Sequence, residues 1–387
     1  MKYFLSGKHV LRHLEKPCVY CSSTDELYEL DEAGFDFLRS CAIPGGCDSS
    51  RADADFIDFC ISEGILTVDP VSLDRPLIIQ SPIPSLRYLE LQITNRCNLR
   101  CRHCYIGGTD NSELSITQLK SVLDEFEAMQ GLRLLITGGE PLMHSRFSEL
   151  NYMLPAYSFR KILFTNGLLL KQDQLNNLHV DEIQISVDGM ERGHDAMRGA
   201  GTFRIVIQNL KLAVEAGFAV SISTMIHREN LTEFDEMEAL FKSIGIRDWT
   251  VDVPCCEGRL MENDSLYMPP EIGGKLMRFG FGGGLHEGAV GYGCGLHLAA
   301  VIANGEICKC AFYAEHSAGT IRDGLAKAWA GIRPVNLEEL ECAKASCDMI
   351  NECRGGCRYR ASLSCGQQVG TGLERDLYKC FHYGIMK

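Results

Sequence analysis

Asn95-Arg-Cys-Asn-Leu-Arg-Cys-Arg-His-Cys-Tyr105 is the most informative segment of this 387-residue sequence. It sets Cys97, Cys101 and Cys104 in a CxxxCxxC spacing on one short loop. An iron-sulfur cube takes one thiolate per iron, so three thiolates hold only three of its corners. The fourth iron is left for a ligand that is not protein. Such an open iron favours chemistry over a closed structural or electron-transfer site.

Other metal and disulfide interpretations fit this loop less well. A structural zinc site usually has two CxxC pairs, or one CxxC with a HxxxH, and His103 has no second half nearby. A disulfide framework is typical of small secreted chains, and the N-terminal residues 1–8 contain no apolar signal-peptide core. An iron-sulfur cluster is therefore the favoured interpretation, with structural zinc as the alternative.

The composition narrows the class of protein. Apolar residues make up 45% and charged residues 23%, as in ordinary globular proteins. No apolar run approaches the roughly 18 residues needed to cross a membrane, so we expect a soluble, cytoplasmic protein. The net charge of −13 argues against a nucleic-acid partner. In a reducing compartment, 19 cysteines are expected to serve largely as metal ligands.

Residues 1–80 are predicted to form a small first domain, which ends at Ser81-Pro-Ile-Pro-Ser85. Its expected strands are 10–14, 18–21 and 27–30, and its expected helices are 31–39 and 54–63. A three-stranded module of this size is too small for an enzyme core. We expect either a docking unit or a cap on the larger domain.

Residues 81–265 are predicted to form the main domain, in which strands and helices alternate. The expected strands are 88–94, 132–137, 161–165, 182–187, 219–225 and 249–253. The expected helices are 147–154, 172–178, 203–216, 233–244 and one that begins at a Ser115/Gln118 capping box and ends at Gly131. Six such units predict a parallel sheet, either open or curled into a partial barrel. Both place the active site at the C-terminal strand ends.

Residues 266–387 are predicted to form a third domain of different character. The stretch 273–295 is rich in glycine and reads as an irregular link, and nine cysteines lie between Cys294 and Cys380. This composition predicts a tail folded around metal rather than around a large apolar core.

Thr137-Gly-Gly-Glu-Pro141 follows the second predicted strand of the main domain. The paired glycines let backbone approach a ligand closely, and Glu140 adds a carboxylate that can accept hydrogen bonds from an ammonium group. A glycine pair after a strand is weak evidence alone. It becomes specific where it follows a CxxxCxxC loop.

Together, the cysteine loop closing on Tyr105 and the GGEP turn resemble the radical S-adenosylmethionine (SAM) superfamily. The resemblance implies a 4Fe-4S cluster held by the three loop cysteines, with its open iron chelated by the amino and carboxylate groups of SAM. Gly138, Gly139 and Glu140 would hold that amino group. One-electron reduction of the sulfonium would then give a 5'-deoxyadenosyl radical that takes hydrogen from an unactivated carbon.

Two further segments resemble elements of the same family, Ser186-Val-Asp-Gly189 and His194-Asp-Ala-Met-Arg-Gly199. The resemblance implies that Ser186 and Arg198 contact the carboxylate or ribose of SAM, and a guanidinium suits a carboxylate because it can bond both oxygens. The alternative for Arg198 is a surface ion pair at a helix start. We expect His194 to be a structural hydrogen bonder.

The C-terminal cysteines resemble the SPASM extension of radical SAM enzymes, through the core Cys353-Arg-Gly-Gly-Cys357. The resemblance, which covers about residues 88–382, implies two auxiliary 4Fe-4S clusters. The first would be held by Cys294, Cys310 and Cys357. The second would be held by Cys342, Cys347, Cys353 and Cys380.

This chain departs from the SPASM pattern at two places. The family has a CxxC ending at Cys347, but position 344 is a lysine, which leaves Cys342 as an uncertain ligand. No cysteine lies shortly upstream of Cys294 to complete the first auxiliary cluster. Cys255, Cys256 or Cys308 could serve, or the iron could be open and bind a substrate thiolate.

Five cysteines of the first domain remain outside these patterns, namely Cys60 and a set of four, Cys18, Cys21, Cys41 and Cys47. Cys18 and Cys21 form a CxxC that could be half of a metal site completed by the other two. The favoured alternative is that all four are small buried residues, as free cysteines often are.

The resemblance also implies a fold and a function. The fold is α/β, a partial (β/α)6 barrel with a winged-helix-like N-terminal module of three strands and helices and a cysteine-rich iron-sulfur C-terminal domain. SPASM members often modify peptides, and residues 1–80 resemble the PqqD-like module that adds a precursor's leader as a strand to a sheet edge. The leading hypothesis is a maturase that installs a thioether or carbon-carbon cross-link in a ribosomally made peptide, with flavodoxin or ferredoxin as electron donor.

Three alternatives stay open at this point. A maturase acting on a folded protein, of the sulfatase-maturase type that oxidises Ser or Cys, is the first, and modification of a small metabolite is the second. A non-enzymatic iron-sulfur electron carrier is the third, although it leaves Glu140, Ser186 and Arg198 unexplained. No residue is assigned as the catalytic acid or base.

Overall fold

A nine-stranded sheet runs through the centre of the computed structural model, in the order β12-β11-β10-β9-β8-β7-β13-β14-β15. The structure describes residues 1–48, 52–107, 110–283, 290–364, 367–368 and 370–386. Six of the strands follow one another in chain order and are parallel: β7 (Tyr88–Gln92), β8 (Arg133–Thr137), β9 (Arg160–Thr165), β10 (Glu182–Ser186), β11 (Ala219–Met225) and β12 (Asp248–Asp252). These are the six predicted strands, and the mostly parallel α/β sheet is confirmed.

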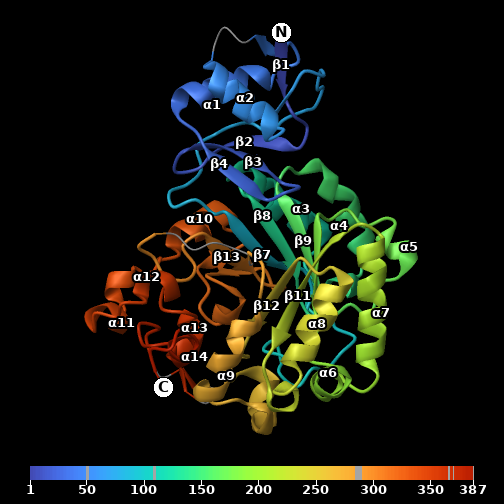
Figure 1. Cartoon of the computed structure of the whole chain (residues 1–387), viewed down its shortest axis with the longest axis vertical. Helices are drawn as coiled ribbons and strands as arrows, with labels where there is room; N and C mark the ends of the chain where they lie inside the picture. The colour runs from blue at the N-terminus through green and yellow to red at the C-terminus, as the bar shows by residue number, and fades with distance from the viewer. Residues whose placement is uncertain (49–51, 108–109, 284–289, 365–366, 369, 387) are drawn as a thin grey trace.

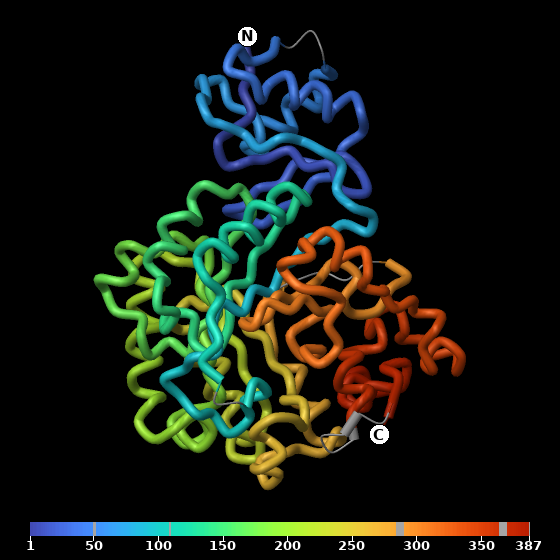
Figure 2. Tube along the Cα trace, turned by 180° about the vertical axis from the view of Figure 1, so that it is seen from behind, coloured from blue at the N-terminus to red at the C-terminus, as the bar shows by residue number. Residues whose placement is uncertain are grey.

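Helices cover the outer face of this sheet (Figures 1 and 2). They are α3 (Ile116–Ala128), α4 (Phe147–Met153), α5 (Gln172–Leu175), α6 (Glu191–Arg198), α7 (Thr202–Glu215) and α8 (Phe234–Ile244). Helix and sheet share one core because strand residues such as Leu89, Leu91 and Ile93 are fully buried against helix residues such as Leu119 and Phe126.

Helix α3 shows where the local prediction holds and where it fails. The capping box is present, with Ser115 accepting from the Gln118 amide and the Gln118 side chain accepting from the Ser115 amide. The predicted end at Gly131 is wrong, because the helix ends at Ala128 and Gln130 takes the left-handed conformation, with φ of 65°. Gly131 is instead required for space, since a Cβ there would lie 2.3 Å from the Phe126 ring.

The C-terminal part of the chain continues the sheet. Strand β13 (Leu298–Val301) pairs in parallel with β7, and β14 (Glu306–Cys308) and β15 (Gly319–Thr320) follow as antiparallel strands. Val301, Ile307 and, from helix α10 (Leu325–Gly331), Trp329 join the main core. The prediction that this tail lacks a large apolar core is therefore wrong for residues 298–331. The remaining elements are short: α11 (Glu341–Lys344), α12 (Ile350–Cys353), α13 (Arg358–Ser362), β16 (Leu363–Ser364), β17 (Gln367–Gln368) and α14 (Leu377–His382).

The glycine-rich link also contains a helix that the sequence reading missed. Helix α9 (Pro270–Leu276) includes Gly273 and Gly274 and packs against α14. A Cβ on Gly274 would lie 2.4 Å from the Tyr378 carbonyl oxygen, so glycine permits this close helix contact. Residues 284–289 of the predicted link lie outside the described part of the chain.

The N-terminal module contains two small sheets. The predicted sheet is present as β2 (His9–His13), β3 (Pro17–Cys21) and β4 (Glu26–Glu29). An unpredicted sheet places β1 (Lys2–Leu5) between β5 (Cys47–Asp48) and β6 (Leu66–Thr67). Helices α1 (Glu32–Cys41) and α2 (Ala54–Ser62) lie close to their predicted positions.

The module docks on the N-terminal ends of the parallel strands, as Figure 1 shows. Arg160, the first residue of β9, donates to the carbonyl oxygens of Ser22 and Ser23 at 2.8 and 3.0 Å and pairs with Glu182 at 2.8 Å. Arg133, the first residue of β8, pairs with Asp25 at 2.7 Å. The β3–β4 turn is thus bound to the N-terminal ends of these strands, on the side of the sheet opposite their C-terminal ends.

Among the residues that the structure describes, no helix combines the length and the apolar character that a membrane crossing requires.

Replacing Arg160 with alanine is expected to lower the free energy of unfolding by about 3 kcal/mol, because it leaves Glu182 buried without its cationic partner. The change also removes both hydrogen bonds to the β3–β4 turn, so the module should become more susceptible to limited proteolysis. Urea denaturation and a proteolysis time course measure the two effects.

Arg39→Ala is the matched control, because Arg39 pairs with Asp36 on the exposed face of α1 at 2.8 Å. Exposed pairs contribute at most about 1 kcal/mol. Equal destabilisation by the two substitutions would contradict the assigned role of Arg160.

Candidate active site

A cavity of about 300 Å³ opens at the C-terminal ends of the parallel strands. Its lining includes the ends of β8, β9, β10 and β11, through Thr137, Thr165, Ser186 and Met225. This edge of the sheet is the one predicted for the active site. The cavity walls also include Cys97, Cys101, Cys104, Gly138, Gly139 and Arg198.

The three loop thiols gather on one wall of this cavity. Cys97 interacts electrostatically with Cys101 and Cys104. Burial raises the pKa of Cys101, and Arg198, whose Nη1 lies 3.9 Å from the sulfur, opposes that rise. Among the described residues, no three Cys, His, Asp or Glu side chains meet closely enough for a single metal ion. Thiolates of an iron-sulfur cube stand farther apart, because each binds a different iron.

The glycine pair brings the GGEP turn against the start of the cysteine loop. The Gly139 amide donates to the Thr94 carbonyl oxygen and the Glu140 amide to that of Arg96, both at 2.8 Å. A Cβ on Gly138 would lie 2.3 Å from the Thr94 oxygen, and one on Gly139 would lie 2.5 Å from the Arg96 oxygen. The close approach that requires glycine here is therefore to the cysteine loop, and it keeps the turn in the cavity wall.

Glu140 is buried behind this turn. Its carboxylate accepts from Thr165 Oγ1 and the Asn166 amide at 2.8 Å each, and from the Leu142 amide at 3.2 Å. Burial raises the pKa of Glu140 to about 7, against the effect of these hydrogen bonds. In this structure the carboxylate joins the ends of β8 and β9, so its predicted contact with an ammonium group stays a prediction.

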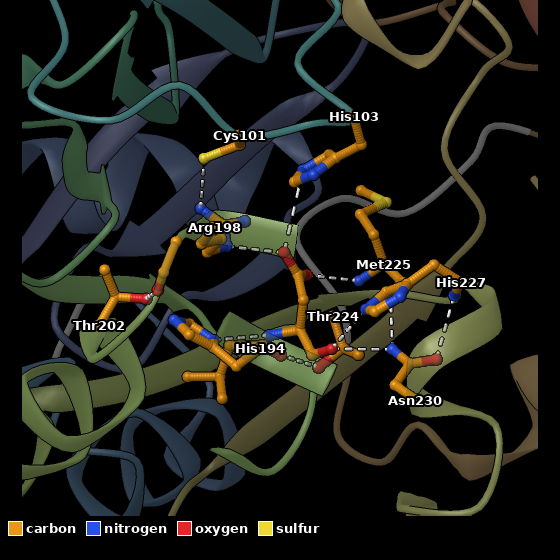
Figure 3. Close-up of polar contacts among 12 residues, drawn as sticks. Cys101, His103, His194, Arg198, Thr202, Thr224, Met225, His227 and Asn230 are labelled. Carbon is orange, nitrogen blue, oxygen red and sulfur yellow. Dashed lines mark hydrogen bonds and ion pairs between the residues drawn. The ribbon is translucent and has the colours of Figure 1, made fainter. Parts of the chain in front are cut away.

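Asp188, two residues after Ser186, contacts Arg198, His103 and Met225, three of the residues labelled in Figure 3. Its fully buried carboxylate pairs with Arg198 at 2.6 Å, accepts from the Met225 amide at 2.8 Å and lies 3.9 Å from His103 Nε2. Burial opposes ionisation, but Arg198 and His103 hold the pKa of Asp188 well below its usual value. Arg198 therefore makes a buried ion pair at the cavity, and the alternative of a surface pair at a helix start is wrong.

A second layer of polar groups fixes the backbone of Asp188 (Figure 3). His194 Nδ1 accepts from its amide at 3.2 Å, which supports the structural role expected for this histidine. His227 Nε2 and Asn230 Nδ2 lie 2.9 Å from its carbonyl oxygen. The loop that follows β11 therefore holds the residue that orients Arg198.

Two buried nitrogens of the cavity lining have no hydrogen-bond partner among the described residues, His103 Nδ1 and Arg259 Nε. Burial lowers the pKa of His103 to about 4, so its ring is neutral at pH 7. Unpaired buried polar atoms are costly, and they commonly mark a site that a polar ligand completes. The donor set of this cavity fits a 4Fe-4S cluster and SAM. It consists of the three loop thiols, the unpaired Arg259 Nε and the exposed backbone of the glycine turn.

Glu90 lines the same cavity from the middle of β7. Its Oε2 accepts a hydrogen bond from the Ala311 amide at 3.3 Å. Burial raises the pKa of Glu90 to about 7, only partly offset by that hydrogen bond. A carboxyl that is half ionised near neutral pH is suited to accept or donate a proton beside a bound substrate.

The structure brings together the cysteines of both predicted auxiliary sites. Cys310 interacts electrostatically with Cys294 and Cys357. In the second group Cys342 interacts with Cys347, and Cys380 with Cys342 and Cys353. The two groupings match the predicted ligand sets, while the presence of clusters in them stays a prediction.

The cysteines of the N-terminal module do not form one group. Cys18 packs with Val10 and Tyr20 at the face toward the main domain, whereas Cys41 and Cys47 belong to the module's own core. Cys21 contacts Ser23. The alternative of small buried residues is therefore favoured over a shared metal site.

Sequence reasoning missed two cavity residues, Glu90 and Arg259, and the buried Asp188 that pairs with Arg198. A signal existed for Glu90, because β7 alternates buried leucines with the polar residues Glu90 and Gln92, and Glu90 lines the cavity. Asp188 lies inside the motif of residues 186–189, in which only Ser186 was assigned a role. Arg259 follows the last predicted strand in an irregular segment and gave no signal.

Part of this chain is similar in sequence to known proteins. Residues 91–241 match the model of the radical SAM superfamily. The mycofactocin maturase MftC of Mycobacterium tuberculosis is 37% identical over 165 residues, which cover 41% of this chain and 42% of that protein. The AdoMet-dependent heme synthase of Oleidesulfovibrio alaskensis is 27% identical over 196 residues, which cover 49% and 50%. The alignments thus span about half or less of these relatives.

Among solved structures, Streptococcus suis SuiB bound to its precursor peptide SuiA has a TM-score of 0.68 at 16% identity, over 96% of this chain and 99% of that one. At this identity the likeness concerns the fold, and it includes the N-terminal module and the C-terminal segment. With the three loop cysteines in the cavity wall and the family model matching across them, residues 91–241 of this chain form a radical SAM domain.

Proposed function

We propose that this protein is a radical SAM maturase that installs a thioether or carbon-carbon cross-link in a ribosomally made precursor peptide. The observation that carries the proposal is the cavity in which Cys97, Cys101 and Cys104 face the glycine turn, Ser186 and Arg198. When bound, the cluster and SAM would supply a 5'-deoxyadenosyl radical able to take hydrogen from an unactivated carbon.

The chain's own residues would bind and orient. The three cysteines would hold the cluster, and the backbone of Gly138 and Gly139 would face the methionine end of SAM. Arg198, held in place by Asp188, would direct its free guanidinium nitrogens toward the carboxylate or ribose. Cys101 and Asp188 are buried, and exclusion of water around them would protect a reactive intermediate. The two C-terminal cysteine groups would hold auxiliary clusters, and flavodoxin or ferredoxin would supply electrons.

The N-terminal module supports a peptide as substrate. In the described part of the chain β4 pairs only with β3, so its outer edge can accept another strand. The other edge of this sheet is covered, because Arg75 donates to the His9 carbonyl oxygen at 2.7 Å and His13 pairs with Gln80. The relative MftC is a mycofactocin maturase, and the SuiB structure holds a precursor peptide.

The position of the module constrains the precursor. It docks on the N-terminal ends of β8 and β9, whereas the cavity lies at their C-terminal ends. A six-residue strand spans about 20 Å, so roughly six or more extended residues must separate the captured leader from the modified residue.

A small-molecule substrate is the second candidate, because one group of relatives comprises heme synthases. A maturase of the sulfatase-maturase type is a third. Neither requires a free strand edge on a separate module. A non-enzymatic electron carrier accounts least well for the site, since it gives no role to Arg198, Asp188 or the unpaired His103 and Arg259 nitrogens.

The proposed chemistry predicts that anaerobically reconstituted, dithionite-reduced protein converts SAM to 5'-deoxyadenosine and methionine, as measured by liquid chromatography. Cys97→Ala should abolish the product, because the remaining two thiolates cannot hold the cluster. Cys60→Ala, at a buried cysteine of the N-terminal module, should retain it. Absence of 5'-deoxyadenosine from the wild-type protein would exclude the radical SAM activity.

Glu90→Gln tests the proton-transfer role of the cavity carboxyl. With a pKa of about 7, Glu90 is protonated at pH 6 and ionised at pH 8, so cross-linking that uses it as a base should rise across this range. Glutamine cannot take the proton. We expect about 100-fold less modified peptide, no rise with pH, and a higher ratio of 5'-deoxyadenosine to modified peptide.

The assay uses a precursor peptide encoded by a short neighbouring open reading frame, with the mass change read by mass spectrometry. Glu262→Gln is the control, since Glu262 is exposed outside the cavity. Unchanged cross-linking and an unchanged pH profile in Glu90→Gln would remove Glu90 from the mechanism.

A further inference from the structure

The two adjacent cysteines that follow β12 face different surroundings. Cys255 is buried, with 4% of its surface exposed, and lines the SAM cavity between Pro254 and Arg259. Cys256 lines a separate pocket with Tyr267. Cys255 is therefore the one of the pair that faces the cavity, whereas Cys256 is only half-buried.

Cys255 meets the first group of C-terminal cysteines. Its thiol interacts with that of Cys357. Cys357 in turn interacts with Cys294, and Cys310 interacts with both. Four thiols from four separate segments therefore converge beside the cavity, one more than the SPASM resemblance supplies.

Ion pairs and hydrogen bonds on both sides of Cys255 hold it against Cys357. Arg360 donates to Asp252 Oδ1 at 2.7 Å and to the Val253 carbonyl oxygen at 3.3 Å. Beyond Cys255, the Tyr359 hydroxyl donates to the carboxylate of Glu257. Residues 252–257 are thus fastened to the start of helix α13, where Cys357 is the N-cap.

Asp376 fixes the partner side of this contact. Its Oδ2 accepts from the Cys357 amide at 2.9 Å and from Arg360 Nη2 at 2.7 Å, and it is almost fully buried. The same arginine therefore positions both the segment of Cys255 and that of Cys357. Such shared support is typical of side chains whose relative position has to be kept within a narrow range.

The other candidate fourth ligands lie elsewhere. Cys308 is fully buried, directs its sulfur toward the Ala300 carbonyl oxygen at 3.9 Å and packs with Ile302 and Ala311. Cys256 faces the second pocket. Cys255 is the candidate whose thiol interacts with Cys357.

We infer that Cys255 is the fourth ligand of the first auxiliary iron-sulfur cluster, completing the set Cys294, Cys310 and Cys357 from the wall of the SAM cavity. The inference rests on the proposed presence of that cluster. Each iron of this cluster then has a cysteine ligand from the protein in the resting state. A substrate thiolate can bind the fourth iron only if Cys255 dissociates from it. On binding, the thiol releases its proton and the iron gains a thiolate.

The test uses the full-length variant Cys97→Ala/Cys101→Ala/Cys104→Ala, reconstituted anaerobically, so that only auxiliary clusters remain. Two 4Fe-4S clusters correspond to about eight irons per chain. Cyanide, which binds an iron with an open position, is added to the reduced protein and the electron paramagnetic resonance spectrum is recorded. The spectrum of this parent variant should not change.

Adding Cys255→Ala should either halve the iron content to about four per chain or yield a cluster whose spectrum shifts with cyanide. Adding Cys256→Ala or Cys308→Ala should leave the iron content and the spectrum of the parent unchanged. The iron content and the response to cyanide depend on neither SAM cleavage nor peptide turnover. A negative result for this inference can therefore be distinguished from a negative result for the proposed function.

A parent variant whose spectrum shifts with cyanide would overturn the inference, because the iron would already be open. So would a Cys255→Ala variant that keeps about eight irons and does not respond to cyanide. A parent variant that binds no iron would overturn both this inference and the proposal that the auxiliary clusters exist.

Discussion

The buried ion pair between Asp188 and Arg198 is the interaction on which the rest of the site depends. Isolated charges are expensive to bury, and breaking such a pair leaves an uncompensated charge. Here the carboxylate also accepts the Met225 amide and lies near His103, so it joins the ends of β10 and β11 to the cysteine loop. Arg198 in turn reaches toward Cys101. The pair thus places a permanent cation beside the predicted cluster ligands.

The parallel sheet separates the N-terminal module from the cavity. The module, with the open side of its strand β4, sits on the N-terminal ends of the parallel strands. The cavity lies at their C-terminal ends. Strand β13 extends the sheet beyond β7 and leads to the loop of Cys310, whose neighbour Ala311 contacts Glu90. The auxiliary cysteines are therefore part of the same framework as the SAM site, and Cys255 belongs to the walls of both. The proposed auxiliary cluster would thus share a wall with the cavity.

Much of the central domain could be predicted because its signals are local. The Ser115/Gln118 capping box and the short apolar strands can be predicted from neighbouring residues alone, without knowledge of distant ones. The cysteine loop and the glycine turn were also readable, since their spacing carries the chemistry. The same local approach cannot show that β13 pairs with β7, because that contact joins residues more than 200 positions apart.

Other features depend on tertiary contacts and gave misleading local signals. The glycines of α9 read as a flexible link, yet they serve close packing against α14. The missing Cβ atoms of Gly138 and Gly139 make room for residues 94–96, a contact that the local pattern does not show. Cys255 was one of several candidates until the contact with Cys357 distinguished it. In each case the deciding fact is which distant segment lies within a few ångströms.

The most direct test of the central claim is electron-nuclear double resonance on the reduced protein with SAM labelled at the methionine amino nitrogen and carboxylate. If Cys97, Cys101 and Cys104 hold three irons and leave the fourth to SAM, both labels should show hyperfine coupling to the cluster, and both couplings should vanish in Cys101→Ala. A cluster that forms on these cysteines, binds SAM and shows no coupling from either label would contradict the account.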